Sequence, residues 1–334
     1  MFLPGWAFFD LRRDGRSDAP NFQCRHRRIS YENERVETIG RYQLVRRLGR
    51  GGMAEVFLAK ATREGGFEKQ LVLKLILPAF ADDPRFVELF FREARIAAQL
   101  NHPNIVQVFD FGTAGDEHFL AMELVDGLSL RELYRAAWGA DRPIPIPIAL
   151  KIIAHLCSAL QYAHEPPRSF VHRDLSPDNV LLSRAGAVKL SDFGLARAVD
   201  ATHSTSLRGK QGYVAPELMS GEGRCDHRAD LFSLGVVMFE ALTGRRPFAG
   251  ATDLAVMQAT LYAQAPSLQK LRPECGDGVD ALVQRLLAKH PDQRVQSARE
   301  ALEAVESELA AFPPVRPSDL ARYFAACAPK QRAK

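Results

Sequence analysis

The chain has 334 residues, of which 46% are hydrophobic and 25% are charged, a composition typical of a globular protein with a substantial core. Its net charge of +4 is not gathered into a basic tail, so we expect no nucleic-acid partner. No apolar run reaches the roughly 18 residues that cross a bilayer, and the cysteines are scattered without C-x-x-C spacing. The sequence therefore predicts no membrane span and a cytoplasmic location, and it leaves the oligomeric state open.

Residues 1–38 show no steady hydrophobic periodicity and are predicted to form a poorly ordered N-terminal extension. After them, Asp83 followed by Pro84 has the pattern of a helix N-cap and first helical position, and that helix should end near Leu100. Alternating apolar and polar residues on both sides of this helix predict strands near 42–48, 54–61, 70–76, 105–111 and 118–124. A small strand-rich lobe is therefore expected first.

The pattern becomes mainly helical after Asp126-Gly127. Helical periodicity covers residues 148–164, 229–243, 253–263, 279–288 and 297–311. A loop-rich stretch at 171–217 separates the first two of these helices. The tail from residue 312 begins with two prolines and predicts one more short helix near 318–326.

A glycine-rich turn joins the first two strands. It consists of Leu48, Gly49, Arg50, Gly51, Gly52, Met53, Ala54, Glu55 and Val56. Glycines let backbone N–H groups approach phosphate oxygens closely and permit positive φ. By itself the turn fits an ordinary hairpin equally well, and no Walker A pattern occurs in the chain.

Lys74 lies inside an apolar strand, where an ammonium group is costly unless it is paired. The helix that follows offers Glu93 on its inward face, and this carboxylate could hold Lys74 within reach of a phosphate. A lysine on an edge strand with its charged end in solvent would give the same local pattern.

The loop-rich stretch holds three further patterns. Residues 172–179 read HRDLSPDN, in which Asp174 could accept a hydroxyl proton and Asn179 could ligate a metal. SDFG follows, with Asp192 after an apolar strand and before a glycine, and then YVAPE, which ends at Glu217. Each pattern is common in proteins, but chance does not account for all of them in this order and at these separations.

Together these patterns resemble the eukaryotic-like (Hanks-type) serine/threonine protein kinases, most closely the bacterial members. The resemblance implies a two-lobed α+β protein-kinase fold over residues 39–311. The N-lobe (39–125) is then a small antiparallel sheet with one helix, the C-lobe (126–311) is larger and mainly helical, and a tail (312–334) follows. It also implies ATP and Mg²⁺ as cofactors, with Mn²⁺ as an alternative, and proteins as substrates.

The resemblance also implies roles for individual residues. Asp174 is implied as the catalytic base, Lys74 as the lysine on the phosphates with Glu93 as its partner, and Asn179 and Asp192 as magnesium ligands. Nucleotide contacts are implied for the whole glycine-rich turn and for Val72, Lys74, Glu123, Val125 and Leu181.

Two structural roles follow from the same resemblance. Asp230 is implied as a buried acid at the start of a central helix, and Arg294 as the partner of Glu217.

Two positions depart from the family pattern. Ser176 stands where most members have a lysine near the transferred phosphate, and Lys210 stands where a threonine is usual in the activation segment. Because the family places these two side chains close together, we hypothesise a swap in which Lys210 supplies the catalytic cation and Ser176 the hydroxyl. The alternatives are a solvated Lys210 beside a slower site, and a catalytically weak or dead kinase-like scaffold that binds protein partners.

Regulation by phosphorylation of the activation segment is the next expectation. Thr202, Ser204, Thr205 and Ser206 lie in this segment, and a phosphate on Thr205 or Ser206 could pair with Arg173 and order it. An ordinary polar loop is the alternative. A small-molecule kinase and a tyrosine kinase fit less well, because YVAPE argues for protein substrates and LSPD resembles the serine/threonine form of the catalytic loop.

Overall fold

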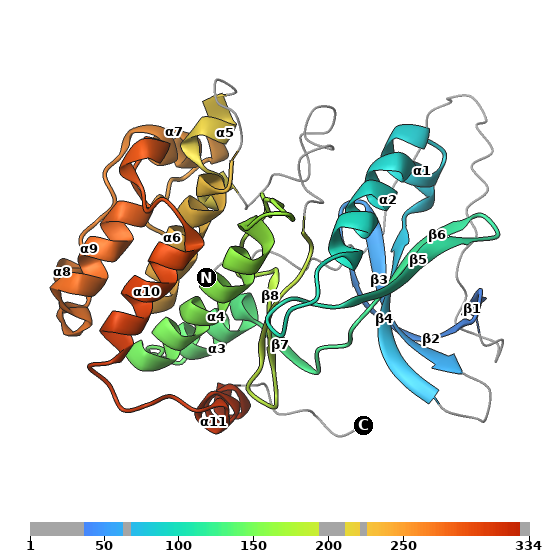
Figure 1. Cartoon of the computed structure of the whole chain (residues 1–334), viewed down its shortest axis with the longest axis horizontal. Helices are drawn as coiled ribbons and strands as arrows, with labels where there is room; N and C mark the ends of the chain where they lie inside the picture. The colour runs from blue at the N-terminus through green and yellow to red at the C-terminus, as the bar shows by residue number, and fades with distance from the viewer. Residues whose placement is uncertain (1–36, 63–67, 194–210, 221–225, 328–334) are drawn as a thin grey trace, which may run out of the picture. The chain divides into compact units, whose positions relative to one another are not determined.

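The computed structural model describes residues 37–62, 68–193, 211–220 and 226–327, so the expected extension at 1–38 lies almost wholly outside the described residues. The N-lobe is built on a six-stranded antiparallel sheet in the order β1-β2-β3-β4-β6-β5 (Figure 1). Its strands are β1 (Thr38–Ile39), β2 (Tyr42–Arg50), β3 (Ala54–Thr62), β4 (Glu68–Ile76), β5 (Val108–Ala114) and β6 (Glu117–Met122). This sheet confirms the strand-rich first lobe.

Helix α2 (Pro84–Ala98) follows the short helix α1 (Pro78–Ala81) and packs on the sheet. The expected cap is present, because the Asp83 side chain accepts a hydrogen bond from the backbone N–H of Arg85 at 3.0 Å. Phe90 and Ala94 are buried in one cluster with apolar side chains of β4, β5 and β6. Glu93 is on this buried face as well and is 5% exposed, so the packing of α2 brings a carboxyl toward the sheet.

The C-lobe is mainly helical and carries one small three-stranded sheet. Its helices are α3 (Leu130–Gly139), α4 (Ile146–His164), α5 (Pro216–Ser220), α6 (Arg228–Thr243), α7 (Asp253–Tyr262), α8 (Leu268–Leu271), α9 (Gly276–Leu286), α10 (Ala298–Leu309) and α11 (Pro317–Cys327). The sheet consists of β7 (Gly127–Ser129), β8 (Val180–Ser183) and β9 (Val188–Leu190) in that order. The helical second lobe is thereby confirmed.

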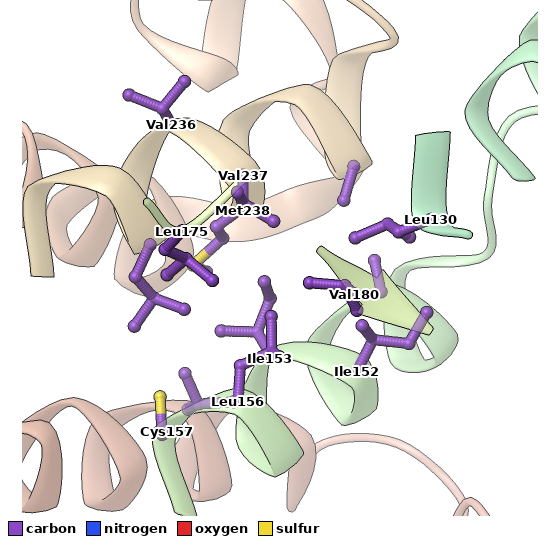
Figure 2. Packing of buried hydrophobic residues seen from close by; sticks show 14 of the residues in the cluster. Leu130, Ile152, Ile153, Leu156, Cys157, Leu175, Val180, Val236, Val237 and Met238 are labelled. Atoms are coloured by element: carbon purple, nitrogen blue, oxygen red, sulfur yellow. The ribbon is translucent and has the colours of Figure 1, made fainter. Parts of the chain in front are cut away.

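Helices α4 and α6 form the centre of the C-lobe core. Figure 2 shows side chains of both helices meeting in one cluster with Leu175 and with Val180 of β8. Leu175, the residue after Asp174, is 1% exposed. The core therefore anchors the loop on which the expected base lies.

Helix α4 is the one described helix that is long and apolar enough to cross a membrane. Two thirds of it (67%) is buried inside the protein, where it packs against α6 and α10. Its apolar composition is explained by this position in the core.

Helix α3 was not expected from the sequence, and helix α11 was. Helix α3 is not among the predicted elements, although Ser129 and Glu132 form a capping box at its start, with the Ser129 N–H donating to Glu132 Oε2 at 2.7 Å. The helix expected near 318–326 is α11, whose Leu320 and Phe324 are each 1% exposed. Helix α11 packs against α3 and β8 of the C-lobe.

Candidate active site

The register of three strands places the glycine-rich turn beside Lys74. Gly49 of β2 lies opposite Val56 of β3, and Val56 lies opposite Lys74 of β4. A hydrogen bond from Gly51 N to Ala54 O, 2.8 Å long, closes the turn, and none of its glycines has positive φ. The left-handed conformation that glycine permits is therefore not used in this turn, and close approach of its backbone to phosphate stays an expectation.

The Lys74 ammonium contacts Asp192 and not Glu93. Lys74 Nζ lies 2.5 Å from Asp192 Oδ1, and the Lys74 side chain is 14% exposed. Both carboxyl oxygens of Glu93 are buried without a hydrogen-bond partner. The expected Lys74–Glu93 ion pair is therefore absent from this structure, and the lysine binds the Asp192 carboxylate instead.

Burial gives the Glu93 carboxyl an unusually high proton affinity. It raises the pKa of Glu93 from 4.5 to about 8, and the positive charge of Lys74 offsets this only in part. Burial thus favours the neutral form of Glu93 over the carboxylate that would pair with Lys74. A Lys74–Glu93 ion pair requires Glu93 to lose its proton, and the three N–H donors of Lys74 leave donors for a second carboxylate beside Asp192.

Asp174 and Asn179 are joined directly within the catalytic loop. Asn179 Nδ2 donates to the backbone oxygen of Asp174 at 2.8 Å and to its Oδ2 at 2.9 Å. The backbone oxygen of Asn179 in turn accepts from the N–H of Ser191 at 2.9 Å and from its hydroxyl at 3.1 Å. Because Ser191 precedes Asp192, these bonds tie the loop to the second expected metal ligand.

The buried carboxylate of Asp230, at the start of α6, holds the backbone at the start of the catalytic loop. It accepts the backbone N–H groups of His172 and Arg173, each at 2.7 Å, and His164 Nε2 at 2.8 Å. Burial by itself would raise the pKa of Asp230, but His164 and His172 together outweigh burial and hold the pKa below its ordinary value. Arg173 has φ of 65°, a conformation that costs about 1–3 kcal/mol and that these bonds support.

The residues expected to hold magnesium present oxygen atoms of the kind that this ion prefers. Asn179 uses its amide nitrogen on Asp174, so the amide oxygen is not part of that bond. Within the described part of the chain there is no cluster of three or more His, Cys, Asp or Glu side chains suited to a metal. An amide oxygen and the Asp192 carboxylate fit Mg²⁺, which proteins typically bind through one or two carboxylates together with substrate phosphates.

The other expected nucleotide contacts come from β4, from β8 and from the segment between β6 and β7. Val72 and Lys74 are two residues apart on β4 and so face the same side of the sheet. Leu181 lies on β8. Glu123 and Val125 lie in residues 123–126, here called the hinge, which connects β6 to β7.

The end of the activation segment is fixed by a buried ion pair. Arg294 Nη1 and Nη2 each lie 2.7 Å from one carboxylate oxygen of Glu217, and Arg294 is 2% exposed. Three backbone carbonyls accept the remaining guanidinium N–H groups. The expected pairing of Glu217 with Arg294 is confirmed.

Arg131 is a residue that sequence reasoning missed. It lies at the start of α3 and donates to Glu240 of α6 at 2.8 Å and to the Tyr213 hydroxyl at 2.6 Å. It also reaches Asp178 of the catalytic loop at 3.3 Å, and Tyr213 donates to Glu240 as well. Neither hydrophobic pattern nor motif spacing marks Arg131, because its partners come from distant parts of the chain.

The Ser176 side chain is 1% exposed, and its hydroxyl has no hydrogen-bond partner. Lys210, its hypothesised counterpart, lies outside the described residues. So do the expected phosphorylation positions Thr202, Ser204, Thr205 and Ser206.

Comparison with known proteins agrees with this geometry. The family model described as the protein kinase domain matches residues 42–305. The kinase domain of PknI from Mycobacterium tuberculosis superimposes with a TM-score of 0.64 at 32% identity, covering 83% of this chain and 98% of that one. The chain belongs to the protein kinase domain family.

Curated relatives extend beyond the matched region. Tyrosine-protein kinase MasK of Myxococcus xanthus is 39% identical over 283 residues, which are 82% of this chain and 44% of MasK. Serine/threonine-protein kinase PknB of Mycolicibacterium smegmatis is 38% identical over 269 residues, 78% of this chain and 41% of PknB. PrkC of Bacillus subtilis, also named a serine/threonine-protein kinase, is 35% identical over 78% of this chain and 39% of PrkC. The chain thus spans less than half the length of these relatives.

Proposed function

We propose that this chain transfers the γ-phosphoryl group of ATP to serine and threonine hydroxyls of proteins in an Mg²⁺-dependent reaction, with residues 39–311 as the kinase domain. The observation that carries the proposal is the convergence of Lys74, Asp192 and the Asp174–Asn179 pair. Lys74 comes from β4 and binds Asp192 at 2.5 Å, while Asn179 holds Asp174 at 2.9 Å and is tied to the residue before Asp192. Phosphoryl transfer needs such positioned charges more than covalent help from the protein.

Each residue then has a defined task. Asp174, oriented by Asn179, accepts the proton of the attacking hydroxyl, an effect typically worth about 10² to 10⁴-fold in rate. Lys74 supplies positive charge to the phosphates through N–H donors that its contact with Asp192 does not use. Asn179 and Asp192 would hold Mg²⁺, which when bound neutralises charge that develops on the phosphate oxygens.

The test combines radiolabelled ATP, Mg²⁺, the purified chain and a generic basic protein, with Asp174→Asn as the control. We expect label transfer by the parent chain and a loss of at least about 100-fold in the control. Equal transfer by both proteins would refute the role of Asp174, and no transfer by the parent would refute the proposal.

Phosphoamino acid analysis of the product decides which hydroxyl is the acceptor. The serine/threonine proposal rests on LSPD at 175–178 and on the relatives PknB and PrkC, whereas the relative MasK is named a tyrosine-protein kinase. Phosphoserine or phosphothreonine is the expected product, and exclusive phosphotyrosine would overturn the proposed acceptor.

The second candidate function is a catalytically weak scaffold that binds protein partners. Ser176 favours it, because a buried and unpartnered hydroxyl stands where most members of the family have a lysine. Our proposal against it remains that Lys210 supplies this cation. Lys210→Ala should then lower turnover strongly while ATP binding stays nearly intact, and near-normal turnover would exclude the swap.

Phosphorylation of the activation segment is proposed as the regulatory step. A phosphate on Thr205 or Ser206 adds a charge of roughly −2 that can pair with Arg173. Mass spectrometry of the active protein should find phosphate on this segment. Active protein without it would contradict the proposal.

A further inference from the structure

A lysine of β9 forms an ion pair with the hinge. Lys189 Nζ lies 2.8 Å from Glu123 Oε2, and the two side chains are 16% and 28% exposed. The same ammonium also reaches the backbone oxygen of Ile105 at 3.4 Å. Most of the surface of both side chains is therefore buried, unlike that of the exposed ion pairs that contribute little.

The Glu123 end of this pair is fixed through both backbone and side chain. Glu123 N donates to Gln107 O at 2.8 Å, and Gln107 N donates to Glu123 Oε2 at 3.2 Å. A hydrogen bond joins residues 104–107 to β9 in each direction, from Val106 N to Leu190 O and from Leu190 N to Asn104 O, each 2.9 Å long. The hinge, residues 104–107 and β9 thus lie side by side, and the Lys189 side chain reaches from β9 to the hinge.

The pair joins two parts of the proposed nucleotide site. Glu123 belongs to the hinge, whose backbone is expected to meet adenine, and Lys189 precedes Asp192 by three residues on the same segment. We propose that the Lys189–Glu123 ion pair is a positioning contact that sets the hinge backbone relative to Asp192 and thereby determines the affinity for ATP. This inference rests on the proposed function only in taking ATP as the ligand.

The position of the pair argues that it acts indirectly. Lys189 and Glu123 line an open cavity of about 440 Å³ together with Lys69 and His102, among other residues. Of the residues expected to contact ATP, Glu123 alone lines this cavity. Lys189 is consequently a positioning residue, and its removal should change the binding of ATP more than the chemical step.

The test compares Lys189→Met and Glu123→Gln with Lys69→Met as a matched control. Lys69 lines the same cavity, but its ammonium lies 3.8 Å from the ring centre of Phe109 and not on a carboxylate. Removing one partner of a shielded pair should raise the Kd and the KM for ATP about five- to tenfold. Lys189→Met should keep kcat within about twofold, and Lys69→Met should leave ATP affinity unchanged.

The exchanged double variant, Glu123→Lys with Lys189→Glu, separates a specific pair from general damage. Recovery of most of the lost affinity supports the proposal, with melting temperatures of all variants recorded alongside. Unchanged ATP affinity in Lys189→Met, or additive losses without recovery in the exchanged variant, would overturn it. Affinity is read by calorimetry with Mg²⁺ and ATP alone, so this result is independent of whether phosphoryl transfer is observed.

Discussion

Glu93 should make the stability of this protein fall as the pH rises toward 8. Burial raises the pKa of its carboxyl from 4.5 to about 8 in the folded chain. Folding therefore takes up a proton between these pH values, so the free energy of unfolding decreases across this interval and is constant above it. Each pH unit corresponds to about 1.36 kcal/mol per proton, so the interval of about 3.5 units sets a ceiling of about 5 kcal/mol.

The substitution Glu93→Gln removes this proton uptake while it preserves the size of the side chain. The variant should gain stability over the parent progressively from pH 5 to pH 8, by about 4 kcal/mol at pH 8, which corresponds to roughly 8 °C in melting temperature. Scanning calorimetry without nucleotide or metal measures the difference, with Glu88→Gln on the exposed face of α2 as the control. A difference that does not change with pH, or one equal to that of the control, would refute the neutral buried state of Glu93.

Two further predictions concern stability. Glu217→Ala leaves the Arg294 guanidinium buried without its carboxylate, so unfolding in urea should show a loss of about 3–5 kcal/mol, and a loss below about 1 kcal/mol would contradict this. Gly186→Ala should destabilise more than Gly115→Ala. Both glycines have positive φ, but an added Cβ at Gly186 would stand 2.1 Å from Pro317 O, whereas at Gly115 nothing lies within 4 Å. Equal shifts in melting temperature would show that α11 does not pack closely on this turn.

Short-range patterns predicted much of the fold because each depends on a few neighbouring residues. Asp83 and Pro84 predicted the start of α2, and the pattern of apolar residues at 70–76 predicted a strand, which the structure shows as β4. Prediction was weaker where a distant segment takes up the backbone hydrogen bonds of a predicted strand. The strand expected from residue 105 begins only at Val108, because Val106 bonds to Leu190 of β9 instead.

In the candidate site, too, the sequence identified the residues, and the contacts between distant residues came only from the structure. The motifs named Asp174, Asn179 and Asp192, and their roles stay predictions that the proposed assays test. Which carboxylate Lys74 binds was not predictable, because Asp192 lies 118 residues further along the chain. The burial of Glu93 depends on how α2 packs on the sheet, and this burial favours the neutral form of a carboxyl that has no hydrogen-bond partner.

The sequence by itself determined that this is a two-lobed kinase-type chain, because the identity and order of the motif residues are properties of the chain alone. The tertiary structure decided the contacts between these motifs. It joined Lys74 to Asp192, brought Arg131 to Tyr213 and Glu240, and placed Lys189 on the hinge carboxylate of Glu123. Side-chain charges pair according to distance and burial in space, and neither quantity can be read from spacing along the chain.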